Sequence, residues 1–327
     1  MQNKLFIPYI LIIGLLFSCK PSIKNDTTKN KIKKTLDIPI FNSDSAYFFV
    51  EQQVNFGPRV ISTKAWQNCS NFLVEKLNSY NADVQIQEAP ITTYDGKNHI
   101  LKNIIASFST EKNNRIALFA HWDSRHVADH DSVNTNQPIL GANDGGSGVG
   151  VLLEIARNIS LKNPAIGIDV ILFDAEDYGQ PENSTYPLMS NSWCLGSQYW
   201  SKNPHKKNYF AKYGILLDMV GGENAKFWQE STSSYYAPNV LKKVWNTAHQ
   251  IGYSDYFVFR LSPQIMDDHY YVNTLAAIPT IDIIEFDPLT KTNFNKHWHT
   301  HSDNMNNVNK KTLKAVGQTV LNVIYSE

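Results

Sequence analysis

The sequence predicts an α/β fold whose sheet is covered by helices on both faces. From about residue 42 onward, short and continuously apolar segments alternate with helical segments. Strands that are apolar throughout, rather than at every second residue, are typical of a sheet that is buried on both sides. No linker-like break interrupts this pattern, so residues 42–327 are expected to form one domain.

The expected strands are short apolar runs at 83–86, 103–108, 115–119, 169–173, 214–217 and 280–284. The expected helices are longer periodic segments at 43–54, 64–80, 147–158, 240–251 and 310–325. Two long stretches, 122–142 and 178–195, fit neither pattern and are rich in Asn, Ser, Pro, Asp and His. Each follows the end of an expected strand, where open α/β sheets bind ligands, so both are expected to border a functional site.

The N-terminus has the composition of a secretion signal. A basic start over residues 1–4 precedes an apolar run over residues 5–17, which is too short to span a bilayer as a helix. The run ends in Leu-Phe-Ser-Cys, which resembles the bacterial lipobox, so residues 1–18 are expected to be a lipoprotein signal peptide. A plain signal peptide with an incidental Cys19 is the alternative.

If Cys19 is lipidated, it becomes the new N-terminus and attaches the protein to a membrane. Residues 19–41 begin with a stretch rich in Lys, Asn and Thr that cannot bury a core, and they are expected to form a flexible tether. The protein would then lie in the bacterial cell envelope, facing the periplasm. The other two cysteines, Cys69 and Cys194, are no disulfide scaffold, and the sequence leaves their pairing open.

The overall charge excludes one class of partner. Thirty basic residues balance thirty acidic residues, and the folded region carries no basic stripe. Nucleic acid is therefore not expected as a partner.

Polar residues with metal-binding chemistry follow several expected strands. His121 and Asp123 come directly after the strand at 115–119, although a histidine there is more often structural. Asp144 lies in the Gly-rich segment before a helix, where its ordinary role would be an N-cap. The surrounding glycines permit a tight backbone that exposes this carboxylate in a cleft instead.

Glu176 and Asp177 follow the strand at 169–173, where adjacent carboxylates are costly unless a cation meets them. A solvated acidic turn is the alternative. One of the two can hold a metal while its neighbour moves protons. Asp218 ends a further strand.

The last candidates are Asp267 and His299, the second in a segment with three histidines in five residues, of which only one need be a ligand. Together, His121, Asp144, Asp177, Asp218 and His299 form an oxygen and imidazole ligand set that suits zinc.

The order of these motifs resembles the zinc aminopeptidase-like superfamily and, within it, the bacterial lipoprotein branch of the glutaminyl-peptide cyclotransferases. The resemblance covers about residues 43–327 and rests on His-x-Asp, Gly-Ala-x-Asp, Glu-Asp, Leu-Asp-Met, Asp-Asp-His and Trp-His-Thr. It implies a three-layer α/β/α fold around a twisted, mixed and mostly parallel sheet, of the zinc exopeptidase type. It also implies an enzyme that cyclises N-terminal glutamine of peptides or proteins to pyroglutamate and releases ammonia.

The resemblance assigns roles to individual residues. Asp144, Asp177 and His299 would hold one Zn²⁺, with Asp177 standing where many relatives have Glu. Glu176 would be the catalytic acid/base. The remaining catalytic and substrate-binding residues would be Asp218 and Asp267, which share protons, and Trp298, Trp122 and Met266, which contact the substrate.

Two other functions remain open at this point. In the di-zinc aminopeptidases of the superfamily, residues matching His121 and Asp218 hold a second metal, so a di-zinc aminopeptidase that removes N-terminal residues is the main alternative. A lipoprotein that binds a peptide or sugar without catalysis is the other, and it gives no reason for Glu176 to lie beside a ligand.

Overall fold

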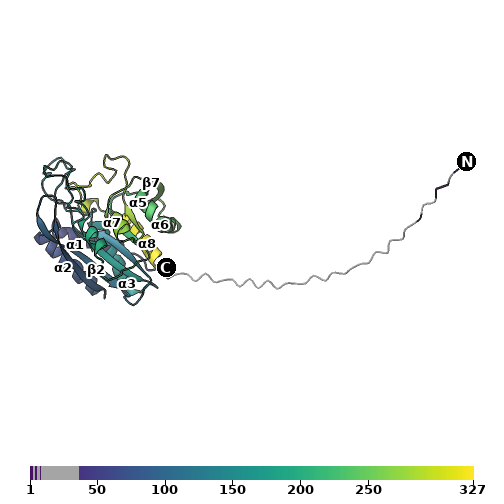
Figure 1. The fold of residues 1–327 in the computed structure, drawn as a ribbon, viewed down its shortest axis with the longest axis horizontal. Coiled ribbons are helices and arrows are strands. Elements are labelled where there is room, and N and C mark those ends of the chain that lie inside the picture. The colour runs from purple at the N-terminus through teal and green to yellow at the C-terminus, as the bar shows by residue number, and fades with distance from the viewer. Residues whose placement is uncertain (3, 6–7, 9–36) are drawn as a thin grey trace. The chain divides into compact units, whose positions relative to one another are not determined.

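The computed structural model describes residues 1–2, 4–5, 8 and 37–327 (Figure 1). Most of the expected signal peptide, Cys19 and residues 20–36 of the expected tether lie outside the described residues. In the described part of the chain, no helix has both the length and the apolar composition needed to cross a membrane. Residues 37–327 belong to one compact unit.

The main sheet has six strands in the order β1-β2-β4-β3-β5-β8. Their bounds are Asp83–Thr92 (β1), Asn98–Phe108 (β2), Arg115–His121 (β3), Gly167–Phe173 (β4), Gly214–Asp218 (β5) and Thr280–Ile284 (β8). β1, β2 and β4 pair antiparallel, whereas β4, β3, β5 and β8 pair parallel. The expected mixed, mostly parallel sheet is confirmed, and the four parallel strands end at the same edge.

Helices cover both faces of this sheet, as the apolar strands predict. On β3, Ile116 and Leu118 face a cluster built with α1 (Ser43–Asn55), α2 (Lys64–Ser79), α3 (Gly146–Leu161), α6 (Pro238–Gln250) and α8 (Lys310–Tyr325). Their neighbours Ala117 and Phe119 face a second cluster, which includes Trp200 of α4 (Leu195–Lys202) and Val272 of α7 (Asp268–Leu275). The alternation along one strand therefore defines three layers.

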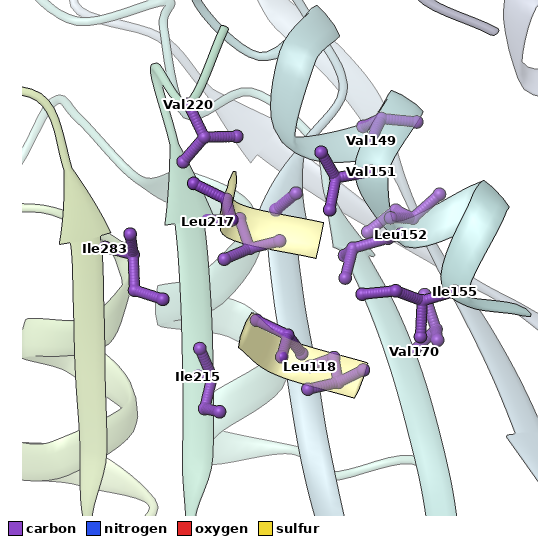
Figure 2. Close-up of a cluster of buried hydrophobic side chains, with 14 of the residues drawn as sticks. Leu118, Val149, Val151, Leu152, Ile155, Val170, Ile215, Leu217, Val220 and Ile283 are labelled. Atoms are coloured by element: carbon purple, nitrogen blue, oxygen red, sulfur yellow. The ribbon is translucent and has the colours of Figure 1, made fainter. Parts of the chain in front are cut away.

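Helix α3 packs closely on the sheet and thereby fixes the loop that precedes it. Figure 2 shows Leu152 and Ile155 of α3 directed toward strand residues such as Leu118. Close approach requires Gly148, because a Cβ there would lie 2.2 Å from the carbonyl oxygen of Leu217 in β5. Truncating a side chain as fully buried as Leu152 to alanine costs about 2–5 kcal/mol in such a core.

All expected strands and helices are present, most with ends displaced by at most three residues, although β1 ends six residues later and β2 begins five residues earlier than expected. Several short elements were not expected. These are β6 (Phe227–Glu230), β7 (Phe257–Ser262), α4, α5 (Ser231–Tyr236), α7 and the 3₁₀ helix η1 (Met305–Asn307). β6 and β7 form a separate two-stranded sheet. None is long enough to show a clear hydrophobic period. The two stretches predicted to be irregular, 122–142 and 178–195, contain no helix or strand except that residue 195 begins α4.

Candidate metal centre and active site

Three predicted metal ligands meet at the carboxyl edge of the parallel strands. Asp144 precedes α3, Asp177 follows β4, and His299 lies in the loop before α8. One potential ligand atom from each lies within 4.8 Å of the others. His299 Nε2 lies 3.1 Å from Asp177 Oδ1 and 3.6 Å from Asp144 Oδ2. The shorter arm of Asp177, compared with Glu, therefore still reaches the cluster.

The chemistry of this cluster fits a divalent cation such as zinc. All three side chains are buried, and among the described residues Asp144 Oδ2 and Asp177 Oδ2 accept no hydrogen bond. Burial and the charge of Asp177 raise the pKa of Asp144 to about 7, so the site disfavours the charged form of this carboxylate. Buried carboxylates with free oxygens beside an imidazole nitrogen are the donor set that zinc takes.

Asp144 is presented by its backbone and not used as a helix cap. The N-cap of α3 is Gly145, at φ +77°, and no side chain caps the helix. A Cβ at Gly145 would lie 2.7 Å from the carbonyl oxygen of Asp123 and 2.8 Å from His121 Cε1. Asp303 holds the other side of the loop by accepting hydrogen bonds from the backbone N–H of Asn143 (2.7 Å) and of Asp144 (3.0 Å). The N-cap alternative for Asp144 is thus excluded.

Glu176 lies in a tight turn next to the cluster. Asp123 accepts hydrogen bonds from the backbone N–H groups of Glu176 and Asp177, both at 3.1 Å, and fixes the turn. The thiol of Cys194 donates a hydrogen bond to Glu176 Oε1 at 3.1 Å. Burial raises the pKa of Glu176 well above its ordinary value; His121 opposes this, and the charges of Asp177 and nearby aspartates add to it. A buried carboxyl group whose pKa is raised in this way is suited to exchanging protons with a bound substrate.

A second cluster of possible metal ligands lies beside the first and shares Asp144 with it. His121 Nε2 is 3.0 Å from Asp144 Oδ1 and 3.1 Å from Asp218 Oδ1, and these three residues also offer ligand atoms within 4.8 Å of one another. Asp267 is the N-cap of α7. Burial and the charge of Asp218 raise the pKa of Asp267 to about 6. The structure therefore brings both carboxylates of the predicted proton-sharing pair to the same pocket.

The predicted ligands and acid/base line a pocket of about 470 Å³ with largely apolar walls. The ring of Trp298 stacks on the imidazole of His299, with centroids 3.7 Å apart, and also contacts Phe294. Met266 lies on the same pocket and is half exposed. Both residues therefore line the same pocket as the carboxylate cluster.

Trp122 does not occupy the position expected for it. It was predicted to contact the substrate, but its side chain is fully buried and does not line the pocket. Its indole stacks on Trp66, with centroids 5.6 Å apart, and donates a hydrogen bond to the carbonyl oxygen of Lys102 at 3.0 Å. The two tryptophans fill the space under the β3 end, so Trp122 supports the core.

Other residues of the site were not recognised in the sequence. Trp193 and Phe294 form part of the pocket wall. Arg125 lies over the ring of Trp193, and Asp129 contacts His299, one of the predicted metal ligands. All four lie in irregular segments, whose hydrophobic pattern does not distinguish a pocket aromatic from a core aromatic. Of the three histidines in the histidine-rich segment, His299 is the one that lies in the carboxylate cluster. It is buried there, while its neighbours at 297 and 301 are partly exposed.

Comparison with known proteins places this architecture among characterised structures. A glutaminyl cyclase from Tannerella forsythia is 52% identical, with a TM-score of 0.87 over 88% of this chain and 100% of that chain. A Bacteroides thetaiotaomicron glutaminyl cyclase bound to N-acetylhistamine is 52% identical, with a TM-score of 0.87 over 89% and 100%. A Zn-dependent exopeptidase from Parabacteroides distasonis is 53% identical, with a TM-score of 0.87 over 89% and 100%.

The family model for peptidase family M28 matches residues 103–324, which is more than half of the chain. The matched range begins in β2 and contains each predicted metal ligand and the predicted acid/base. With its strand-end carboxylates and histidines in the order described above, this chain is a member of peptidase family M28.

Proposed function

We propose that this protein is a zinc-dependent glutaminyl-peptide cyclotransferase, which converts N-terminal glutamine of peptides or proteins to pyroglutamate and releases ammonia. The observation that carries the proposal is the stacking of Trp298 on His299, which gives the ligand cluster an apolar aromatic wall. The high identity to two bacterial proteins named glutaminyl cyclases, over nearly the whole domain, supports it.

Asp144, Asp177 and His299 would hold the zinc ion. When bound there, zinc supplies a Lewis acid that polarises the γ-carbonyl group of the substrate glutamine. It also compensates the carboxylate charges of the buried cluster. These ligand assignments rest on the mutual distances and the free carboxylate oxygens described above.

Glu176 would carry the proton transfers. The substrate α-amine attacks its own γ-carbonyl carbon, so a C–N bond forms and the nitrogen must lose a proton, which Glu176 Oε2 accepts. As the bond between the side-chain carbonyl carbon and the amide nitrogen breaks, Glu176 returns this proton and the leaving group departs as ammonia. The thiol of Cys194 occupies Oε1, which leaves Oε2 for this exchange.

The pocket size supports an N-terminal residue as the substrate. Its volume of about 470 Å³ suits one side chain and the adjoining peptide group, and the ligand cluster forms part of its wall. Trp298 and Phe294 would pack on the methylene groups of glutamine. Asp218 and Asp267 would share a proton and hold the α-amine near Glu176.

A di-zinc aminopeptidase is the second candidate, and the second cluster of possible metal ligands favours it. His121, Asp144 and Asp218 could hold another cation, with Glu176 activating water. One solved relative is also named a Zn-dependent exopeptidase. The two functions differ in metal stoichiometry and in whether the product retains its first residue.

The deciding experiment uses protein that lacks residues 1–19 and a glutamine-initiated peptide, with peptide mass and ammonia followed together. We expect loss of one ammonia with the peptide chain intact, and one zinc per protein. The matched control is the same peptide with an acetylated N-terminus, which cannot cyclise. Release of free glutamine, with two metals per protein, would establish the aminopeptidase instead.

We also propose that Cys19 is lipidated and anchors the protein in the bacterial envelope, facing the periplasm. The support is the lipobox-like segment that ends at Cys19. A Cys19→Ala protein should move from the membrane fraction to the soluble fraction. Unchanged membrane association would contradict this proposal.

A further inference from the structure

The metal-ligand histidine has a second contact on the side away from the cluster. His299 Nε2 is directed to Asp144 and Asp177, whereas its Nδ1 lies 3.1 Å from Asp129 Oδ1. Asp129 belongs to the irregular segment 122–142, so no helix or strand holds it in place. Backbone hydrogen bonds of neighbouring residues, such as that from the N–H of Ala128 to the carbonyl oxygen of Thr135 at 2.9 Å, hold the loop, and side-chain contacts orient the carboxylate of Asp129.

Arg125 provides these contacts. Its guanidinium is fully buried and donates hydrogen bonds to both carboxylate oxygens of Asp129, with Nε at 3.2 Å from Oδ1 and an Nη atom at 2.5 Å from Oδ2. Its other Nη atom donates to the backbone carbonyl oxygens of Asp177, at 2.9 Å, and of Gly179, at 2.7 Å. The guanidinium also lies over the ring of Trp193, 4.3 Å from its centroid.

We propose that Arg125 and Asp129 are positioning residues of the metal centre, which orient His299 and fix its tautomer. The negative charge of Asp129, 3.1 Å from Nδ1, favours the proton on that nitrogen, so that the lone pair of Nε2 is left for the metal position. Through Arg125 the same pair holds the backbone of a second ligand, Asp177. This inference rests on the proposed zinc site formed by Asp144, Asp177 and His299.

A purely structural ion pair would not require this arrangement. An arginine–aspartate pair that only stabilised the loop could satisfy its remaining donors anywhere in segment 122–142. Here Arg125 and Asp129 instead make specific contacts with two of the three proposed ligands, Arg125 with the backbone of Asp177 and Asp129 with the imidazole of His299. Loss of such an outer partner typically weakens metal binding 10- to 100-fold.

The test measures zinc affinity of the full-sequence protein by competition with a chromophoric chelator. Asp129→Asn should bind Zn²⁺ about 10- to 100-fold more weakly than the unchanged protein. Asp131→Asn is the matched control, because Asp131 lies in the same segment and contacts the backbone of His301 but not His299. It should bind as the unchanged protein does. Equal affinity of folded Asp129→Asn and unchanged protein would overturn the proposal.

A second readout separates positioning from stability. In the ¹⁵N NMR spectrum of the zinc-loaded protein, the His299 Nδ1 should carry the proton, and Asp129→Asn should change its shift while leaving the other histidines as they are. If Asp129→Asn does not fold, Asp129→Glu keeps the charge that balances Arg125 and displaces the carboxylate; unchanged affinity and Nδ1 shift there would refute the inference.

Failure of the proposed function would look different. If the unchanged protein binds zinc but does not cyclise glutamine peptides, the affinity comparison still decides the role of Arg125 and Asp129. If it cyclises them and Asp129→Asn retains full affinity, only this inference fails. A protein that binds no zinc would overturn both.

Discussion

Replacement of Glu176 by glutamine tests the centre of the proposed mechanism. Glutamine has nearly the same size, and its carbonyl oxygen can still accept the hydrogen bond that the Cys194 thiol donates to Oε1 at 3.1 Å. The amide replaces Oε2, which faces His121 Nδ1 at 3.9 Å. Packing is thus preserved, whereas the ability to take up a proton is lost.

The expected loss follows from the number of proton transfers. One general acid/base contributes about 10²- to 10⁴-fold, and Glu176 serves both the attacking amine and the departing ammonia. We therefore expect kcat to fall by about 10⁴-fold, which corresponds to roughly 5 kcal/mol in the activation free energy. KM should change little, because the pocket walls formed by Trp298 and Phe294 are unchanged.

The assay is ammonia release from a glutamine-initiated peptide, together with the bound zinc per protein. Glu176→Gln should retain zinc, because the proposed ligands Asp144, Asp177 and His299 are intact. Glu182→Gln makes the same chemical change at an exposed position in the neighbouring irregular stretch and should leave kcat unchanged. A zinc-loaded Glu176→Gln protein that kept more than a tenth of the activity would refute the assignment.

Three further predictions concern the pocket, the thiol and the core. Trp298→Ala should lower kcat/KM for glutamine peptides by roughly 10- to 100-fold through loss of aromatic packing on the substrate, measured by initial rates; an unchanged value would remove Trp298 from the pocket wall. Cys194→Ser should retain most activity because a hydroxyl still donates to Glu176, whereas Cys194→Ala should lower kcat; equal rates would show that the donor is unimportant. Asp169→Asn should lower the free energy of unfolding by about 3–5 kcal/mol near neutral pH, since it leaves Arg115 buried and unpaired. Burial opposes ionisation of Asp169, but hydrogen bonds from Arg115 outweigh it and lower its pKa in the folded state. The difference between the two proteins should therefore shrink as pH falls below about 4, the pKa of an unfolded aspartate, and a constant difference in denaturation at several pH values would contradict this account.

The strand ends could be predicted because two simple rules act together. An apolar run identifies a buried strand, and parallel strands present their carboxyl ends at one edge. His121, Asp177 and Asp218 each follow such a run, so the sequence predicts that they meet. Asp144 could be predicted from the glycines around it, which permit the tight backbone turn that presents its carboxylate to the cluster.

Trp122 shows where this reasoning fails. It directly follows His121, yet successive side chains at a strand end point to opposite sides, and its indole enters the core beside Trp66. The roles of Arg125 and Asp129 could not be predicted for a different reason. These roles depend on contacts with residues about 50 and 170 positions away, which no local pattern encodes.

The backbone around the pocket adds a feature that residue types conceal. Ala175, Cys194, Met219 and His299 all have positive φ, between 48° and 57°, although none is glycine. Left-handed conformations of such residues cost about 1 kcal/mol or more each and persist only where surrounding contacts impose them. Here the buried strand ends and the hydrogen bonds of the turns impose them, and each strained residue either borders or belongs to the proposed site. Glycine would relieve this strain but would also free the turns, so the strained residues help to keep the proposed ligands in one arrangement before metal or substrate binds.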